Sequence, residues 1–445
     1  MDPYLGYEIA LLVVVAYGVI VYLIYRAGWI GPDRWLSLLG PVLMIKTQRG
    51  RAALDRWARF RRFWTWVADV GIALAVVAMG AIVVLLVLDA VLSLRLNAAT
   101  APPVTEALGL PGINPIIPIG YGILALVVGV VLHELAHGVV ARSQGIGVKT
   151  LGILWCVVPV GAFVEQDDVE MQAASRRKRD RVAAAGVLAN FALTVLFFAA
   201  LSLLVASSVA PNANGVGVAV VESNTPAANA SLVPGDIITS INGTATTNST
   251  LFESSLTDTH PGEVVPVVFY SSATGRLVAA NITLAPSPTY PGRGYLGVAV
   301  TFLTPTELRD SLVWPLGSSS GPAVGAIDWL VLPLATLEPV SGSTIEFYHL
   351  TGPLSGADPS AFWIVANILY WLAWMNLLLG LSNALPLVPL DGGLLFRDFA
   401  ASVAARFRRG WSAARLEAFG TRAVTATSLL VLLLLAWQFI VPRLL

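Results

Sequence analysis

The segment His133-Glu134-Leu135-Ala136-His137 has a residue spacing that could hold a metal ion. On a helix, residues four positions apart lie on one face, so both imidazoles can reach the same Zn²⁺. Glu134 then lies beside the metal, where it can take a proton from water and later deliver it to a leaving amine. The pattern predicts metal-assisted hydrolysis. The alternative is a histidine pair that is hydrogen-bonded inside a helical bundle.

The composition indicates that this chemistry takes place in a membrane protein. Hydrophobic residues make up 56% of the 445 residues and charged residues only 12%, whereas soluble domains average about 25% charged residues. Six apolar segments are long enough to cross a bilayer, and we expect helices at 7–25, 63–92, 119–141, 182–209, 362–387 and 424–440. Ionisable residues inside such a span indicate a functional site by default, and the HELAH segment lies inside one.

The distribution of positive charge predicts the orientation of these spans. Nine Lys or Arg residues lie between 26 and 62, seven between 142 and 181, and six between 397 and 422. These segments are expected to be cytoplasmic under the positive-inside rule. Only three basic residues lie between 204 and 360, so this segment and the N-terminus are expected outside. The HELAH segment then lies near the cytoplasmic end of its helix, in a multi-pass protein of the cell membrane.

A catalytic zinc ion needs a third protein ligand and an open position for water. The single cysteine, Cys156, excludes a multi-cysteine zinc site. His260 and His349 lie in the segment expected outside. Asp391, followed by two glycines, closes an apolar span that reaches the same side as the HELAH helix, so it is the better candidate. The alternative is a helix-terminal turn in which Asp391 is only a cap.

Residues 216–300 differ in character from the rest of the chain. Short β-branched runs alternate with Gly, Pro, Asn and Asp, a pattern typical of strands and turns. The run 223–244, with Pro234-Gly235-Asp236 and Asn242-Gly243, resembles the middle of a PDZ domain. Such a domain captures an extended peptide by adding it to a sheet edge. The alternative is a β-rich ectodomain without a ligand. A further apolar but proline-interrupted stretch, 312–337, could be interfacial, re-entrant or an irregular span.

The motifs together resemble the site-2 protease family of intramembrane metalloproteases. The resemblance covers HELAH with Gly138, Asn383 with Pro386 and Leu390-Asp391-Gly392, the PDZ-like insert, and Ala185-Gly186-Val187-Leu188-Ala189-Asn190, where Val187 replaces the usual proline. Residues 159–163 resemble the family's membrane-associated β-hairpin, which we expect over 150–164.

The resemblance implies one zinc ion per chain, held by His133, His137 and Asp391, with Glu134 as the general base. It further suggests that Asn383, with Asn190 as a second candidate, positions the substrate or the developing oxyanion; interhelical hydrogen bonding is the alternative role for both. An edge strand of the hairpin could pair with an unwound substrate.

The expected fold is an α-helical polytopic membrane protein with about six transmembrane helices and an inserted β-rich PDZ-like domain. Its expected parts are a first helix and basic loop (1–62), a transmembrane core with the HExxH helix and hairpin (63–209), the extracytoplasmic PDZ-like domain (212–303), an irregular connector (304–360), a transmembrane segment with the LDG motif (361–396), and a basic loop with the last helix (397–445).

The predicted activity is that of an intramembrane zinc endopeptidase that cleaves transmembrane substrates in regulated intramembrane proteolysis. Its expected partners are substrate helices, the lipid bilayer, and a peptide or substrate ectodomain at the PDZ-like domain; no nucleic acid partner is expected. Two alternatives are another membrane HExxH peptidase that acts on loops or tails, and a non-enzymatic scaffold that binds peptides.

Overall fold

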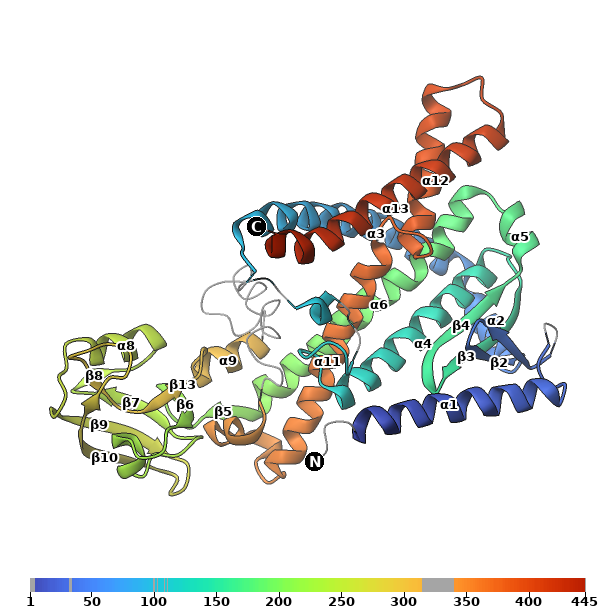
Figure 1. Ribbon diagram of the computed structural model, residues 1–445. Coiled ribbons are helices and arrows are strands. Elements are labelled where there is room, and N and C mark those ends of the chain that lie inside the picture. The colour runs from blue at the N-terminus through green and yellow to red at the C-terminus, as the bar shows by residue number, and fades with distance from the viewer. Residues whose placement is uncertain are drawn as a thin grey trace. The chain divides into compact units, whose positions relative to one another are not determined.

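The computed structural model describes residues 5–31, 34–98, 101, 103–107, 109, 111–313 and 340–444 of the chain (Figure 1). The chain divides into two compact units. The first contains Met1–Val195 and Leu372–Leu445, and the second contains Leu196–Trp371. Each unit has its own architecture.

Among the described residues, five helices are long and apolar enough to cross a membrane. They are α3 (Arg61–Leu92, extended to Arg95 by the short 3₁₀ helix η1, Ser93–Arg95), α4 (Ile119–Ser143), α6 (Arg176–Ser208), α11 (Pro359–Ala384) and α13 (Ala413–Leu444). The sixth predicted span corresponds to α1 (Leu5–Arg26), a helix of 22 residues. The predicted fold class, a polytopic α-helical membrane protein with a β-rich insert, is confirmed.

Small side chains allow the long helices of the first unit to approach closely. Ala75, Ala184 and Val187 are fully buried in one cluster that joins α3 to α6. A side chain at Gly71 would meet Leu188 at 3.2 Å, so glycine sets the spacing of these two helices. This packing through small residues is typical of helices in lipid, where no hydrophobic driving force brings helices together.

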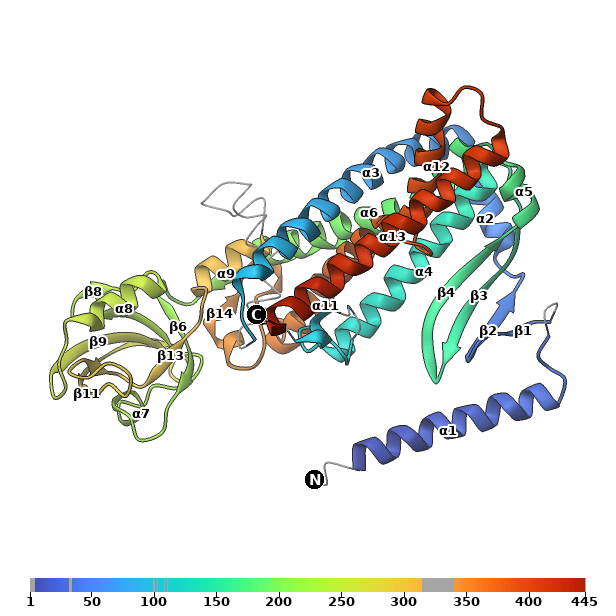
Figure 2. The same ribbon diagram turned by 45° about the horizontal axis from the view of Figure 1, so that its top comes forward.

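A four-stranded antiparallel sheet accompanies the helices of the first unit (Figure 2). Its order is β1 (Leu36–Leu39), β2 (Val42–Thr47), β3 (Val148–Cys156) and β4 (Val158–Gln166). The hairpin expected over 150–164 is formed by β3 and β4. The basic segment expected to be a loop contains β1, β2 and the helix α2 (Arg51–Ala58). The sequence did not predict them, because the many charged residues hide the short apolar run of β1.

The helix α11 ends at Ala384, three residues earlier than the predicted end of the span. Pro386 explains the difference, because the residue before a proline is disfavoured from the helical conformation. The chain then turns through residues 385–390 and begins α12 (Asp391–Phe407). The short helices η2 (Val104–Ala107) and α5 (Asp168–Ala173) complete this unit.

The second unit contains the β-rich domain. Its main sheet has the order β10 (Arg276–Thr283), β9 (Val264–Ser271), β7 (Ile237–Ile241), β6 (Val216–Val221) and β13 (Val298–Val300), with β8 (Thr244–Ala245) paired to β7. On β9, the buried residues Val265, Val267 and Phe269 alternate with more exposed ones, as expected for a strand with one buried face. Phe252 and Leu256 of α8 (Ser249–Thr257) pack into the same core.

The turns of this domain follow the sequence pattern. Asn242 and Gly243 both have positive φ angles, 50° and 77°, and connect β7 to β8 in the manner of an Asn-Gly hairpin turn. Asp236 is fully buried; its Oδ2 accepts a hydrogen bond from the Val233 amide at 2.9 Å and its Oδ1 accepts one from the Ser272 amide at 2.8 Å. The Pro-Gly-Asp turn is therefore fixed by its own carboxylate.

The remaining elements of the second unit are short. They are β5 (Val209–Pro211), α7 (Pro226–Asn229), β11 (Ala285–Pro286), β12 (Gly294–Tyr295), α9 (Pro305–Leu312), η3 (Gly342–Phe347), β14 (Tyr348–Leu350) and η4 (Gly352–Leu354). Residues 314–337 of the apolar stretch 312–337 lie outside the described residues, so the prediction for that stretch is not tested.

Candidate metal centre

The helix α4 places His133 and His137 on one face, one turn apart. Both residues are only 7% exposed, and their Nε2 atoms lie 3.1 Å from each other. The two ring nitrogens are therefore close enough to bind one common ligand.

Asp391 completes the cluster from a distant part of the sequence. Its Oδ2 lies 3.2 Å from Nε2 of His133 and 3.3 Å from Nε2 of His137. The buried Oδ2 of Asp391 forms no ordinary hydrogen bond in the described part of the chain.

The glycines after Asp391 explain how the carboxylate reaches the histidines. A Cβ atom at Gly392 would lie 2.2 Å from the Ala384 carbonyl oxygen, and one at Gly393 would lie 2.7 Å from the Leu387 carbonyl oxygen. Only glycine allows α12 to fold back against the end of α11. Asp391 is the first residue of α12, where the helix dipole also favours a negative charge.

The three ligand atoms have the spacing that a zinc ion requires. Zn²⁺ binds nitrogen and oxygen at about 2.0–2.1 Å in a tetrahedral arrangement, so neighbouring ligand atoms lie about 3.3–3.4 Å apart. The observed separations of 3.1, 3.2 and 3.3 Å match such a triangle. The two-histidine, one-carboxylate set therefore fits zinc and leaves the fourth tetrahedral position to a ligand from outside the protein.

Gly186 on α6 keeps the space beside the histidines open. A Cβ atom at this position would lie 2.4 Å from Nε2 of His133 and 2.5 Å from Nε2 of His137. Any side chain there would occupy space needed by the metal or its ligands. In the sequence, Gly186 stands only in a family-like segment and has no predicted role. It lies on a different helix from the two histidines, so no residue spacing indicates the contact.

A hydrogen bond to a backbone carbonyl group of α6 orients one of the imidazoles on α4. Nδ1 of His137 lies 2.7 Å from the Val182 carbonyl oxygen, which can only accept, so Nδ1 carries the proton and Nε2 presents its lone pair to the cluster. Such a partner fixes the tautomer and the ring orientation of a metal-ligating histidine. The sequence could not reveal this contact, because a backbone carbonyl has no residue signature.

Glu134 is held beside the cluster by the sheet. Its Oε2 accepts a hydrogen bond at 3.1 Å from the amide of Val164 on β4, the edge strand. The carboxylate is half-buried. One of its oxygens is thus fixed by the protein, and the other can exchange a proton with a reacting molecule.

The two asparagines of the predicted site have different surroundings. Nδ2 of Asn383 donates to the Leu379 carbonyl oxygen of its own helix at 3.0 Å. Asn190 is fully buried on α6, one turn beyond Gly186, and neither polar atom of its side chain has a hydrogen-bond partner among the described residues. Asn190 therefore has unused hydrogen-bonding capacity close to the cluster, whereas the role of Asn383 stays a prediction.

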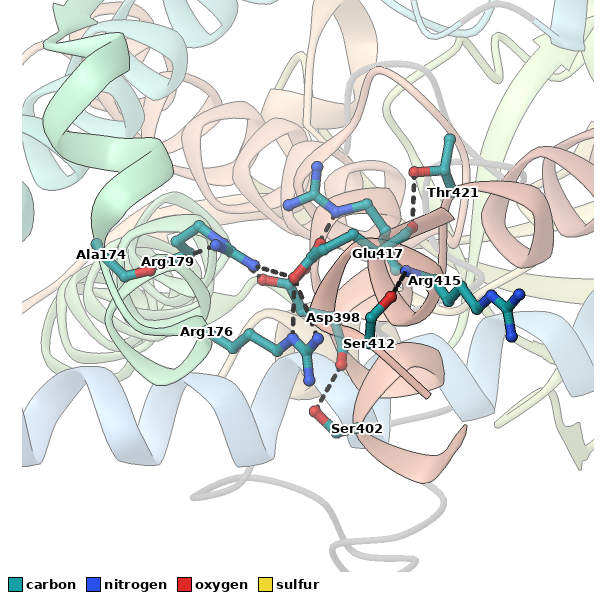
Figure 3. A network of polar contacts seen from close by, with 10 residues as sticks. Ala174, Arg176, Arg179, Asp398, Ser402, Ser412, Arg415, Glu417 and Thr421 are labelled. Atoms are coloured by element: carbon teal, nitrogen blue, oxygen red, sulfur yellow. Dashed lines mark hydrogen bonds and ion pairs between the residues drawn. The ribbon is translucent and has the colours of Figure 1, made fainter. Parts of the chain in front are cut away.

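An ionic network holds α12, the helix that begins with Asp391, against α6. Asp398 is 1% exposed and accepts hydrogen bonds from Nε of Arg179 at 2.9 Å and from Nε of Arg397 at 3.0 Å. In Figure 3, Arg179 also points toward Glu417 of α13, at 3.3 Å. Because α6 carries Val182 and Gly186, this network joins the third ligand's helix to the helix that contacts the histidines.

Comparison with known proteins identifies the family. A model of peptidase family M50 matches residues 121–431, which is 311 of the 445 positions and includes the whole cluster. The chain belongs to peptidase family M50. It is a multi-pass membrane metalloprotease of a zinc-dependent family, and the predicted family and enzyme class are confirmed.

Several known proteins are similar in sequence to half or more of this chain. An uncharacterised protein of Methanocaldococcus jannaschii is 27% identical over 362 residues, which cover 80% of this chain and 77% of that protein. Metalloprotease MmpA of Caulobacter vibrioides is 25% identical over a region that covers 71% of this chain and 93% of that protein. Zinc metalloprotease RasP of Shouchella clausii is 26% identical over 53% of this chain and 55% of that protein.

A solved structure also matches part of this M50 chain. It is the crystal structure of the PDZ domain of an SdrC-like protein from Listeria monocytogenes, which is 27% identical, covers 20% of this chain and 88% of that domain, and has a TM-score of 0.18.

Proposed function

We propose that this M50 protein is an intramembrane zinc endopeptidase that cleaves transmembrane substrates during regulated intramembrane proteolysis. The observation that carries the proposal is the convergence of His133, His137 and Asp391 beside Glu134, at one end of an apolar helix long enough to cross a bilayer. One bound zinc ion would acidify water and polarise the scissile carbonyl group.

Glu134 is proposed as the general base. It accepts a proton from the attacking water and later delivers it to the leaving nitrogen, while the Val164 amide holds its other oxygen in place. His137 is oriented by the Val182 carbonyl and presents Nε2 to the metal. Asn383 or Asn190 would donate to the oxyanion, where charge appears only in the transition state.

The edge strand β4 supports the proposal for substrate binding. A transmembrane helix hides its amides in internal hydrogen bonds and must be unwound before hydrolysis. Val164 directs its amide away from β3, toward Glu134, so Ala162, two residues earlier, presents its backbone to the same side. A substrate segment that pairs with Ala162 would lie beside Glu134.

The orientation of the molecule is part of the proposal. The HELAH segment lies in the last three turns of α4, which carries Arg142 in its last turn and leads into the basic stretch 142–181. This distribution supports an active site near the cytoplasmic side, with the N-terminus and the β-rich domain outside.

The β-rich domain, 212–303, is proposed to bind a peptide or a substrate ectodomain. A cavity of about 240 Å³ lies between α8 and residues 287–298, and its lining combines apolar side chains such as Phe252 and Leu296 with charged ones such as Glu253 and Arg293. The edge strand β13, which begins at Val298 of this lining, suits an extended peptide whose backbone adds to the sheet.

A Glu134→Gln variant tests the proposed activity. We expect it to retain stoichiometric zinc, because its ligands are intact, and to accumulate uncleaved membrane fragments that proteomics can identify. The matched control is Glu170→Gln on α5, whose carboxylate bonds the Gly147 amide outside the cluster. Full cleavage by Glu134→Gln would refute the proposed mechanism, and accumulation of soluble loops or tails instead would favour a different membrane peptidase.

A further inference from the structure

A polar cavity lies at one end of the four-stranded sheet, away from the metal cluster. Its volume is about 550 Å³, and its lining includes Arg34, Lys46, Arg51, Lys149 and Glu165. Four positive side chains and one negative side chain give this lining a net charge of +3, and Lys149 also pairs with Asp167 at 3.6 Å and Asp168 at 3.9 Å, which lie outside the lining. We call these residues the cationic pocket. Such a concentration of positive charge in a membrane protein indicates an anionic ligand.

The register of the sheet places the cationic pocket at the end of α1. Ile30, four residues after α1, bridges to Leu36 at the start of β1, and the Trp35 carbonyl accepts a hydrogen bond from the Lys46 amide. The opposite end of the β1–β2 hairpin reaches the middle of α1, where Tyr17 Oη lies 2.9 Å from the Pro41 carbonyl oxygen. The hairpin therefore runs back along α1, and only its basic end lies level with the helix terminus (Figure 2).

The exposed side chains at the two ends of the β1–β2 hairpin differ in kind. Near the turn, Leu39 is 60% exposed, as expected for a side chain that faces lipid. At the basic end, Trp29, Trp35 and Trp57 are all more than half exposed. Exposed tryptophans are enriched at the level of the lipid headgroups. The cationic pocket is therefore at the depth where phosphate groups lie.

The positive groups of the pocket are arranged to receive a phosphate. Lys46 Nζ lies 3.7 Å from Glu165 Oε2, which also accepts a hydrogen bond from Thr150 Oγ1, so this pair is fixed on the floor of the pocket. Arg51 begins α2, and the preceding Gly50 has no side chain that could cap the helix. The positive end of the helix dipole adds to the charge of Arg51 and favours an anion at this point.

We infer that the cationic pocket binds the phosphate-bearing headgroup of an anionic membrane lipid. The site would communicate with the active centre along one strand. Glu165 on the pocket floor follows Val164, whose amide bonds Glu134. A bound headgroup would order the end of β4 and thereby the strand that holds the proposed general base. The inference concerns lipid binding and holds whether or not the proposed proteolytic mechanism is correct.

Lipid retention by the full-length protein tests this inference. The protein is purified in nanodiscs of phosphatidylcholine with and without phosphatidylglycerol, and retained lipids are measured by native mass spectrometry. We expect preferential retention of phosphatidylglycerol, reduced about five-fold in Arg51→Gln and in Lys149→Gln, because each basic residue near an anionic surface contributes a comparable factor. Arg409→Gln, an exposed cation between α12 and α13, is the matched control and should retain lipid like the wild type.

Two further arms identify the ligand. Inorganic phosphate should not displace the lipid, because the acyl chains anchor it; displacement would mean that the pocket binds free phosphate instead. An acidic substrate segment is the other possible occupant. Equal lipid retention by all variants, together with a raised KM of Lys149→Gln for a substrate with an acidic flank, would overturn the lipid assignment.

Discussion

The Asp398 carboxylate on α12 and the Arg179 guanidinium on α6 form an ion pair in which Asp398 is 1% exposed and the N–O distance is 2.9 Å. Asp398 lies two helical turns after Asp391, on the same face of α12. This pair therefore controls where α12 lies relative to α6, and with it the distance from Asp391 to the histidines.

Replacing Asp398 should weaken both the fold and metal binding. An Asp398→Asn variant removes the buried charged partner of Arg179 and leaves it only the exposed Glu417 among the described residues, and breaking a buried pair costs about 3–5 kcal/mol. We expect a lower unfolding temperature and a weaker zinc affinity in a competition titration with a chromophoric chelator. Asp55→Asn, which breaks the exposed pair with Arg142, is the control and should change neither quantity appreciably. Unaltered zinc affinity in a folded Asp398→Asn protein would contradict the positioning role.

A single methyl group on α6 should abolish zinc binding. In Gly186→Ala, the new Cβ atom would lie 2.4 Å from Nε2 of His133, well inside van der Waals contact, so the histidines or α6 must move. Zinc content, measured by atomic absorption on purified protein, is expected to fall below one ion per chain, and cleavage is expected to be lost.

Gly80→Ala is the matched control for this substitution. It places the same methyl group in the membrane helix α3, where no atom lies within 4 Å of the new Cβ. We expect normal zinc content and normal cleavage. One zinc ion per chain in Gly186→Ala would show that the metal site does not need the space that Gly186 leaves beside the histidines.

Removing one backbone N–H group should slow the chemical step. In Val164→Pro, Glu134 loses the hydrogen bond at 3.1 Å that fixes its Oε2. A hydrogen bond to a charged group contributes about 1.5–3 kcal/mol, so kcat should fall about 10- to 100-fold. Because this amide points away from β3 and proline is tolerated on edge strands, the sheet should survive.

Ala162→Pro separates proton transfer from substrate pairing. The same substitution two residues earlier leaves the bond to Glu134 intact but removes an outward amide that a substrate strand would use. Steady-state kinetics on a transmembrane substrate should show a raised KM with little change in kcat. If both constants were unchanged, pairing of the substrate with β4 would be wrong.

Chelation should remove both activity and stability. A metal that binds only the folded state stabilises it by about 4 kcal/mol when its concentration is 1,000 times Kd, so the unfolding temperature of the protein should fall in the presence of a zinc chelator. Zn²⁺ should restore activity, whereas Mg²⁺ should not, because Mg²⁺ prefers oxygen ligands in an octahedral arrangement and this set contains two nitrogens. Restoration by Mg²⁺ would exclude the proposed ligand set.

The sequence alone determined the elements of this protein that depend on local pattern. The apolar spans were visible because a helix in lipid must be apolar over its length, and His133 and His137 were visible because a helix brings residues four apart together. The Asn242-Gly243 turn was visible because only a few residues accept positive φ angles. Asp391 was predicted as the third ligand because its apolar span ends on the same side as the HELAH helix, and the family resemblance implied the same residue; no local rule links it to residues more than 250 positions earlier.

The tertiary structure decided what depends on long-range contact. Gly186, the Val182 carbonyl and the Val164 amide contact the cluster from α6 and β4, and none has a residue type or spacing that indicates such a contact. The strands β1 and β2 were hidden by their basic surroundings, although strand pairing with β3 brings those charges into the cationic pocket. Backbone groups and small residues act through where they lie, and their positions follow only from the packing of the whole chain.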